Sequence, residues 1–260
     1  MIRGVDLDAD VSGEGPDVVW GHGLTSSRAS EDELGLIDWS AIRSASRVLR
    51  YDARGHGTSG STPDPADSSW RSLAEDQLAL ADEFGTGAYV AGGASMGCAT
   101  ALHAAVLAPG RVRGLLLVIP PTAWAIRAAQ TAAYRVMADL VEAGDHESLL
   151  RGAAASPPPD PFAEDPRWAD RFRDLLATAD PARLALIFRG AATADLPTTD
   201  EVAAIDVPTL ILAWTGDPGH PASSAARLQE LMPDAELALA ATPAGLAGWT
   251  GRAMRFLAQF

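Results

Sequence analysis

Cysteine is almost absent from this chain of 260 residues, in which Cys98 stands alone. A single cysteine cannot form an internal disulfide bond, and such sparing use fits a reducing compartment, so we expect a cytoplasmic protein. The sequence also has no N-terminal basic-then-apolar signal and no apolar run of about 18 residues. We therefore expect neither export nor a membrane span.

Positive charge is scarce as well. The chain has 20 Lys and Arg residues against 34 Asp and Glu residues, a net charge of -14, and no basic tract. Because binding to a phosphate backbone requires clustered cations, nucleic acid is not an expected partner. There is no internal repeat of solenoid length. The 47% hydrophobic residues are sufficient for a sizeable core, and length alone does not decide between one domain and two.

Apolar strands and amphipathic helices alternate in the first half of the chain. This alternation predicts a parallel sheet with helices on both faces. The predicted strands cover residues 17–20, 46–52, 88–93 and 112–120, and the predicted helices cover residues 68–84 and 96–110.

The pattern changes between residues 121 and 197, where no strand is predicted. Helices are expected within 122–144 and 165–192, separated by a proline-rich segment at 156–162. We interpret this region as a helical insertion. The alternation then resumes, with strands at 207–214 and 235–240 and helices at 221–232 and 249–260.

The stretch Gly-Ala-Ser-Met-Gly, residues 93–97, connects a predicted strand to a predicted helix. A serine on such a tight turn is strained, and Gly93 and Gly97 relieve the crowding around it. The turn would lift the Ser95 hydroxyl above the sheet and place the Met96 N–H at a helix N-terminus, where it can stabilise an oxyanion. Ser95 is therefore a candidate nucleophile, although glycine-serine turns also occur as plain connections.

Three segments in order, "WGHGLTSS", "YDARGHGTSG" and "GGASMG", resemble the α/β-hydrolase fold, especially its esterases and lactonases. The resemblance implies a mostly parallel sheet of eight strands, or slightly fewer, flanked by helices. It also implies a core formed by residues 1–120 and 198–260 and a helical cap formed by residues 121–197. The second oxyanion donor would be the Leu24 N–H. A serine at the elbow implies acyl transfer without a cofactor or metal, rather than dehalogenation or epoxide opening.

The family places its catalytic histidine after the last strand, but residues 241–250 contain none. Of the five histidines, His22 and His56 are expected to shape loops. His103 lies about two turns into the helix after Ser95, roughly 12 Å away, and is expected to face away from the serine or into packing. His146 is expected at an exposed helix start.

His220 is the remaining histidine, in the loop where the family keeps its catalytic acid. Asp217 occupies the acid position, and two strand spacings of about 4.8 Å each would separate this loop from Ser95. We therefore predict that His220 is the general base and that Asp217 orients it. Two alternatives stay open: His220 caps the helix that begins at residue 221, or another carboxylate, from the cap, orients the histidine.

Other residues are weaker candidates. Trp124 is expected either at the pocket mouth or in the cap core, and Cys98 in buried packing. The acidic stretch 30–38 lacks the glycine of a metal-binding loop and is expected to be a solvated surface loop.

The sequence thus predicts a serine hydrolase that cleaves a small-molecule ester, lactone or thioester through an acyl-enzyme at Ser95. Two other functions stay open. One is a degenerate hydrolase fold that binds a ligand or partner without turnover; the other is C–C bond hydrolysis or acyl transfer on the same frame.

Overall fold

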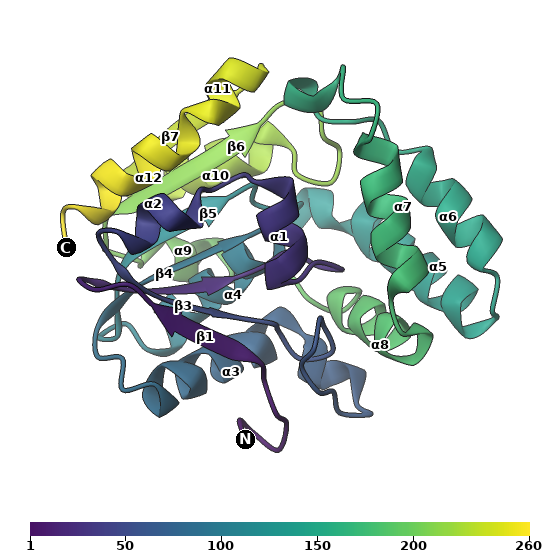
Figure 1. Cartoon of the computed structure of the whole chain (residues 1–260), viewed down its shortest axis with the longest axis horizontal. Coiled ribbons are helices and arrows are strands. Elements are labelled where there is room, and N and C mark those ends of the chain that lie inside the picture. The colour runs from purple at the N-terminus through teal and green to yellow at the C-terminus, as the bar shows by residue number, and fades with distance from the viewer.

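The computed structural model describes residues 1–260 and is built on one seven-stranded sheet (Figure 1). The strand order is β1-β3-β2-β4-β5-β6-β7, and only β1 runs antiparallel to its neighbour, β3. The sheet is therefore the slightly reduced form of the predicted one. The strands are β1 (Ala9–Ser12), β2 (Asp17–Gly21), β3 (Arg47–Tyr51), β4 (Tyr89–Ala94), β5 (Val112–Val118), β6 (Thr209–Trp214) and β7 (Ala235–Ala240).

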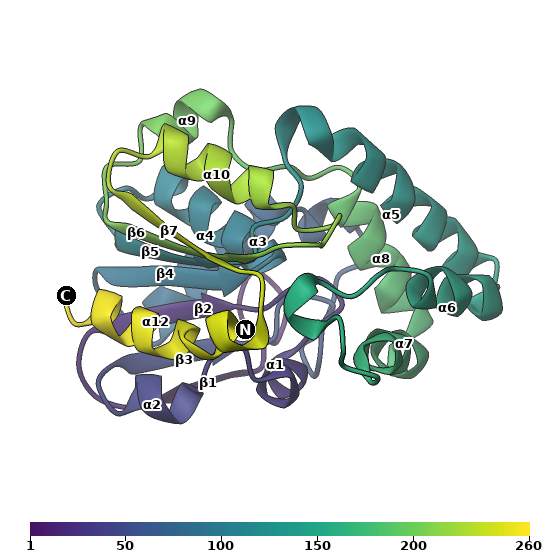
Figure 2. The ribbon, with the colours of Figure 1, turned by 90° about the horizontal axis from the view of Figure 1, so that it is seen from above.

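Helices cover both faces of the sheet, which is why β4 and β6 are buried along their whole length (Figure 2). One face carries α3 (Trp70–Glu83), α4 (Met96–Leu107), α9 (Thr199–Ala203) and α10 (Ala222–Leu231). The other face carries α1 (Arg28–Leu34), α2 (Trp39–Arg43) and α12 (Trp249–Leu257), while the short α11 (Pro243–Ala247) follows β7. A separate apolar core lies on each side of the sheet.

A helical insert stands beside the sheet, to its right in Figures 1 and 2, and contains no strand. It consists of α5 (Arg127–Glu142), α6 (His146–Ala154), α7 (Trp168–Thr178) and α8 (Pro181–Ala191), with the 3-10 turns Trp124–Ile126 and Asp160–Phe162. Asp180 caps α8 ahead of Pro181, so the predicted helical region 165–192 is divided in two. The domain division at residues 121 and 197 stays a prediction.

Arg127 fixes the start of the insert to the core. Its buried guanidinium donates to the carbonyl oxygens of Ala191 and Ala194 and lies 4.1 Å from the centroid of the Trp70 ring. This contact joins the start of α5 to the end of α8, so the insert is attached where it leaves the sheet and where it returns.

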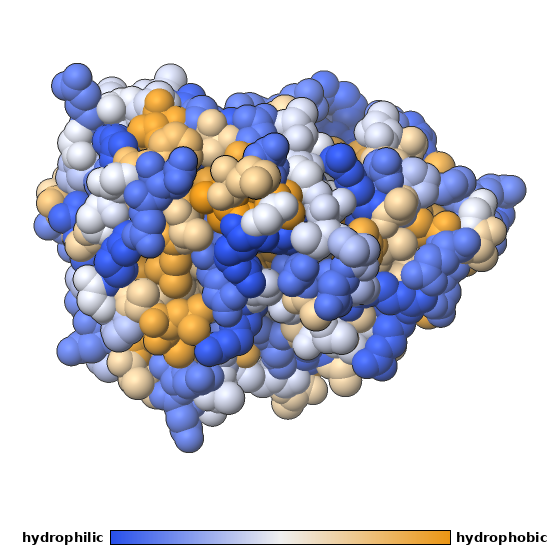
Figure 3. Space-filling model, turned by 90° about the horizontal axis from the view of Figure 1, so that it is seen from below, coloured by the Kyte–Doolittle hydropathy of each residue, from blue (hydrophilic) through white to orange (hydrophobic).

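The surface is a mixture of polar and apolar side chains. Figure 3 shows apolar groups in several separate patches on the face seen from below. No helix has both the length and the apolar character that a membrane crossing requires.

Candidate active site

Ser95 lies between β4 and α4 with φ 51° and ψ −107°, a backbone conformation that few non-glycine residues adopt. The surrounding glycines make this turn possible. A side chain at Gly97 would collide with the carbonyl oxygen of Gly21, and one at Gly93 would collide with the Gly97 backbone. The strand–turn–helix context predicted for residues 93–97 is therefore present, with the Ser95 hydroxyl facing a pocket.

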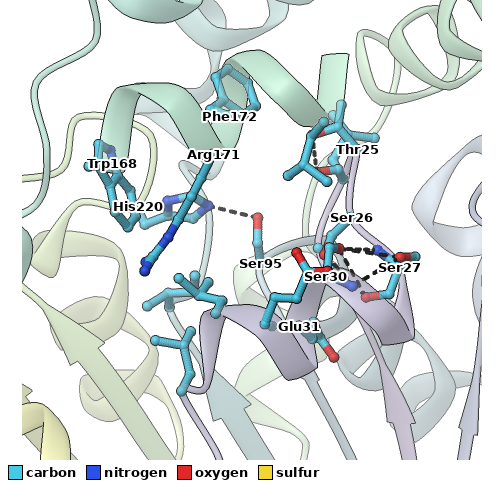
Figure 4. Close-up of a pocket in the computed structure, with 18 of the residues that line it drawn as sticks. Thr25, Ser26, Ser27, Ser30, Glu31, Ser95, Trp168, Arg171, Phe172 and His220 are labelled. Atoms are coloured by element: carbon cyan, nitrogen blue, oxygen red, sulfur yellow. Dashed lines mark hydrogen bonds between the residues drawn. The ribbon is translucent and has the colours of Figure 1, made fainter. Parts of the chain in front are cut away.

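His220 reaches Ser95 from the loop that follows β6. Its Nε2 lies 2.8 Å from the Ser95 Oγ, and Figure 4 marks this contact with a dashed line. The sheet order brings them together, because β6 is two strands away from β4. His220 does not cap α10: the capping residue is Pro221, and no side chain provides a cap hydrogen bond there. The structure therefore contradicts the alternative that His220 caps this helix.

Asp217 faces the other nitrogen of the same imidazole. Its Oδ2 lies 2.8 Å from the His220 Nδ1 and also accepts a 2.9 Å hydrogen bond from the indole N–H of Trp214. Its Oδ1 accepts the backbone N–H groups of Gly219 and His220. The Asp217 side chain thereby closes the turn of its own loop, which is how an acid and a base three residues apart can face each other.

The electrostatics of this pair favour an ionised acid. Burial of the Asp217 carboxyl raises its pKa, but the His220 charge and the hydrogen bonds together outweigh it and lower the pKa to about 2. An ionised Asp217 accepts a hydrogen bond from the Nδ1–H of His220, which leaves Nε2 unprotonated and able to accept the Ser95 hydroxyl proton. The arrangement can therefore activate a serine for attack on a carbonyl carbon.

Two backbone N–H groups beside Ser95 are unused. Those of Met96 and Leu24 donate no hydrogen bond to the protein, and Met96 is the first residue of α4. A methyl group at Gly23 would lie 3.5 Å from the Ser95 Cβ, so the loop carrying Leu24 runs directly past the serine. Free N–H donors on both sides of a serine are the components of an oxyanion hole.

The other histidines form no hydrogen bond with Ser95. The His22 Nε2 accepts the Ala53 N–H, so this ring shapes the loop after β2. The His56 Nδ1 donates a hydrogen bond to the Arg54 carbonyl oxygen, and burial lowers the pKa of the His56 imidazole to about 3. His103 bonds the Asp195 carbonyl oxygen and His146 is exposed at the start of α6, both as predicted.

A cavity of about 680 Å³ opens over the Ser95 hydroxyl, between the sheet and the insert. Aromatic and aliphatic side chains form most of its lining, and hydroxyl groups from residues 25–30 form one wall (Figure 4). Trp124 does not line this cavity: its backbone N–H donates to the Asp195 carboxylate, and its indole N–H donates to the Pro197 carbonyl oxygen. Trp124 packs against the apolar core that lies under α3 and α4, so it lies neither at the pocket mouth nor in the core of the insert, and both expectations are wrong.

The acidic stretch 30–38 is also not the expected surface loop. It forms most of α1 and ends at Asp38, the residue that caps α2, and Glu31 is turned inward to accept the Trp20 indole N–H at 2.9 Å. Burial raises the pKa of Glu31 to about 7, although the Trp20 hydrogen bond and the Arg50 guanidinium lower it. The alternation of acidic and apolar residues concealed this one inward-facing carboxyl.

Cys98 is fully buried, with its thiol against the carbonyl oxygens of Gly93 and Val118, as predicted. No cluster of three or more His, Cys, Asp or Glu side chains is arranged to hold a metal ion. Two residues of the site were missed in the sequence, Trp214 and Arg171. Trp214 ends a predicted strand three residues before Asp217. Arg171 interrupts the helical spacing of apolar residues on α7, and this charged residue among apolar ones could have indicated a role in the cavity.

Residues 18–253 match the model of a family described as the alpha/beta hydrolase family. Among curated proteins, the chain is 34% identical over 103 residues to the sn-1-specific diacylglycerol lipase of Mus musculus. That match covers 40% of this chain and 32% of the mouse protein, so the chain spans about a third of this relative.

Solved structures resemble the whole chain. A hydrolase from Pseudomonas aeruginosa has a TM-score of 0.82 at 26% identity, over 98% of this chain and 95% of that one. The enol-lactonase from Burkholderia xenovorans has a TM-score of 0.79 at 22% identity, over 99% and 96% of the two chains. A thermophilic esterase from Thermogutta terrifontis has a TM-score of 0.76 at 23% identity, over 98% and 92%.

Proposed function

Because this chain belongs to the alpha/beta hydrolase family, we propose that it is a serine hydrolase that cleaves a carboxylic ester, lactone or thioester. The observation that carries the proposal is the continuous hydrogen-bonded series from Asp217 through His220 to Ser95. The lipase, lactonase and esterase among the similar proteins support ester chemistry.

The reaction follows from the positions of these groups. The His220 Nε2 takes the proton of the Ser95 hydroxyl as Oγ attacks the substrate carbonyl, while Asp217 stabilises the imidazolium that forms. The N–H groups of Leu24 and Met96 hold the oxyanion of the tetrahedral intermediate. His220 then protonates the leaving oxygen or sulfur, and a water molecule activated by the same imidazole releases the acid from Ser95. We also propose that the predicted cap, residues 121–197, limits substrate size, because α7 forms part of the cavity wall.

A fluorophosphonate probe combined with ester hydrolysis tests this function. Covalent labelling at Ser95 is expected, and Ser95→Ala and His220→Ala should each lower kcat by about 10³-fold or more. The double variant should lose little more than either single variant, since the two residues act as one unit. His146→Ala, at the exposed histidine of α6, is the matched control and should retain activity.

Two outcomes would contradict the proposal. Retention of most activity in His220→Ala would mean that another group is the base. A folded native protein that neither labels at Ser95 nor hydrolyses any ester, lactone or thioester would instead support a ligand-binding role for the cavity.

A further inference from the structure

Arg171 is the one arginine that lines the cavity over Ser95. It lies on α7, which also contributes the apolar side chains of Trp168, Phe172 and Leu175 and the polar side chains of Asp174 and Thr178 to the lining. Figure 4 shows its side chain extending from α7 into the pocket, on the same side of Ser95 as His220, with the hydroxyl-rich wall of residues 25–30 on the other side. A permanent positive charge therefore faces the space where a substrate would lie.

The guanidinium of Arg171 is poorly satisfied by the protein. It donates no hydrogen bond within the protein: its one ion pair joins the buried Nη1 to the Oδ2 of Asp165 at 3.3 Å, without hydrogen-bond geometry. By contrast, the partly or fully buried guanidinium groups of Arg50, Arg54 and Arg127 each donate at least two hydrogen bonds. Desolvated N–H groups that lack a hydrogen bond cost free energy, so an acceptor on a ligand that binds the remaining N–H groups of Arg171 would stabilise this site.

The carboxylates around the cavity do not occupy that role. Asp217 is engaged in four hydrogen bonds within its own loop and with Trp214. Glu31 faces the Trp20 indole. Glu33 and Asp174 are exposed, where water and salt weaken their fields. Asp165, which does not line the cavity, pairs with Arg171 at 3.3 Å and with Arg167 at 4.0 Å, so it offsets the Arg171 charge only in part. A bound substrate beside the Ser95–His220 pair therefore still meets the positive charge of Arg171.

We infer that the substrate carries a carboxylate on an otherwise apolar acyl chain, and that Arg171 binds this carboxylate. The inference rests on the proposed hydrolase function and adds the substrate class. A guanidinium presents paired N–H groups that match the two oxygens of a carboxylate, and the resulting charge-assisted hydrogen bonds orient the scissile carbonyl at Ser95. The apolar lining on either side accommodates the methylene chain of the same substrate.

Paired esters that differ only in charge test the inference. We would compare the p-nitrophenyl monoester of adipic acid with the p-nitrophenyl ester of adipamic acid, and repeat the comparison with the corresponding suberic acid derivatives, so that two chain lengths are tested. The native protein should show a higher kcat/KM for the anionic ester of at least one pair. Arg171→Gln should lower kcat/KM for that ester by roughly 10- to 100-fold and change the neutral ester less than about twofold.

Two further variants separate charge from folding. Arg171→Lys keeps the charge without the planar fork and should retain part of the preference. Arg173→Gln is the matched control, because Arg173 is exposed on the same helix and pairs with Asp170. The Arg173→Gln variant should have the native kcat/KM for both esters. Increasing ionic strength should lower the preference in the native protein and leave it unaltered in Arg171→Gln.

The two proposals fail in different ways. If Arg171→Gln lowers kcat/KM equally for both esters, or for neither ester, then Arg171 does not select a charged substrate. In that case the inference is overturned while the hydrolase proposal stands. If the native protein hydrolyses no ester of either pair and Ser95 does not react with a fluorophosphonate, the proposed function fails and the inference fails with it.

Discussion

The indole N–H of Trp214 donates a 2.9 Å hydrogen bond to the Oδ2 of Asp217, the same oxygen that faces the Nδ1 of His220. Trp214 is the last residue of β6 and is stacked on Trp249, with 6.1 Å between ring centroids. The Trp214 ring also meets the His220 ring edge to face. A rigid sheet residue therefore holds both the acid and the base that face Ser95.

Trp214→Phe should lower kcat by about 3- to 20-fold with little change in KM. The substitution keeps most of the ring packing and removes one hydrogen bond to a charged oxygen, which contributes roughly 1.5–3 kcal/mol. Only part of that energy is expected in the rate, because three other donors still hold Asp217. Steady-state kinetics with one activated ester measures the effect.

Trp249→Phe provides the matched control for that substitution, since Trp249 is buried in the same aromatic cluster and its indole N–H has no contact with Asp217. Its thermal stability should fall by an amount similar to that of Trp214→Phe, while its kcat stays near the native value. Equal kcat losses in both variants would show that packing, and not the hydrogen bond, positions Asp217.

Asp217→Asn should reduce kcat by about 10³–10⁴-fold with the fold intact. The Asn oxygen can still accept the Gly219 N–H, so the turn is preserved, but an amide N–H facing the His220 Nδ1 favours the wrong imidazole tautomer. The measurement is kcat near pH 8, together with a thermal melt to establish folding. If more than a tenth of the activity survives, a carboxylate from elsewhere orients His220, as the sequence left open.

Ionisation of the buried Glu31 should lower the free energy of unfolding as the pH rises. Its pKa is about 7 in the folded chain against an ordinary value of 4.5, so the folded state keeps a proton that the unfolded state has released between these values. The free energy of unfolding therefore falls as pH increases through this range, by up to about 3 kcal/mol. Below the ordinary value both states are protonated and the contribution is fully present.

Urea unfolding at pH 5, 6, 7 and 8 measures this dependence. Glu31→Gln is neutral throughout and can still accept the Trp20 indole N–H, so its curve should lack the Glu31 component. Glu33→Gln, exposed on the same helix, should follow the native protein. Parallel curves for the native protein and Glu31→Gln would show that Glu31 ionises normally.

The local sequence was sufficient to predict the strands of the sheet and the turn that carries Ser95. Residues 93–97 can form a tight strand-to-helix turn because glycine flanks the serine, and the glycine contacts in the structure are of that steric kind. The uncharged run 114–118 is buried along its whole length, as expected for a strand covered on both faces. The prediction of a mostly parallel sheet with a helical insert is confirmed by the strand order and by the family match.

The incorrect expectations concern side-chain direction. Trp124 has positive φ and turns towards the core under α3 and α4, and nothing in its neighbours along the chain indicates this rotation. Glu31 lies among exposed acidic residues, and only the position of Trp20 on β2 shows that it faces inward. A single charged residue in a polar stretch gives no periodicity that distinguishes its two possible faces.

The sequence by itself determined the order of elements, the glycine-flanked Ser95, and the absence of a histidine from residues 241–250, because these depend on local sterics and on residue identity alone. It also limited the choice of base to five histidines. The tertiary structure decided which of them reaches Ser95, because that contact depends on strand order and on a turn closed by the Asp217 side chain. It also decided that Trp214 holds Asp217 and that Arg171 faces the cavity, since contacts between distant segments form only when the sheet and the insert pack together.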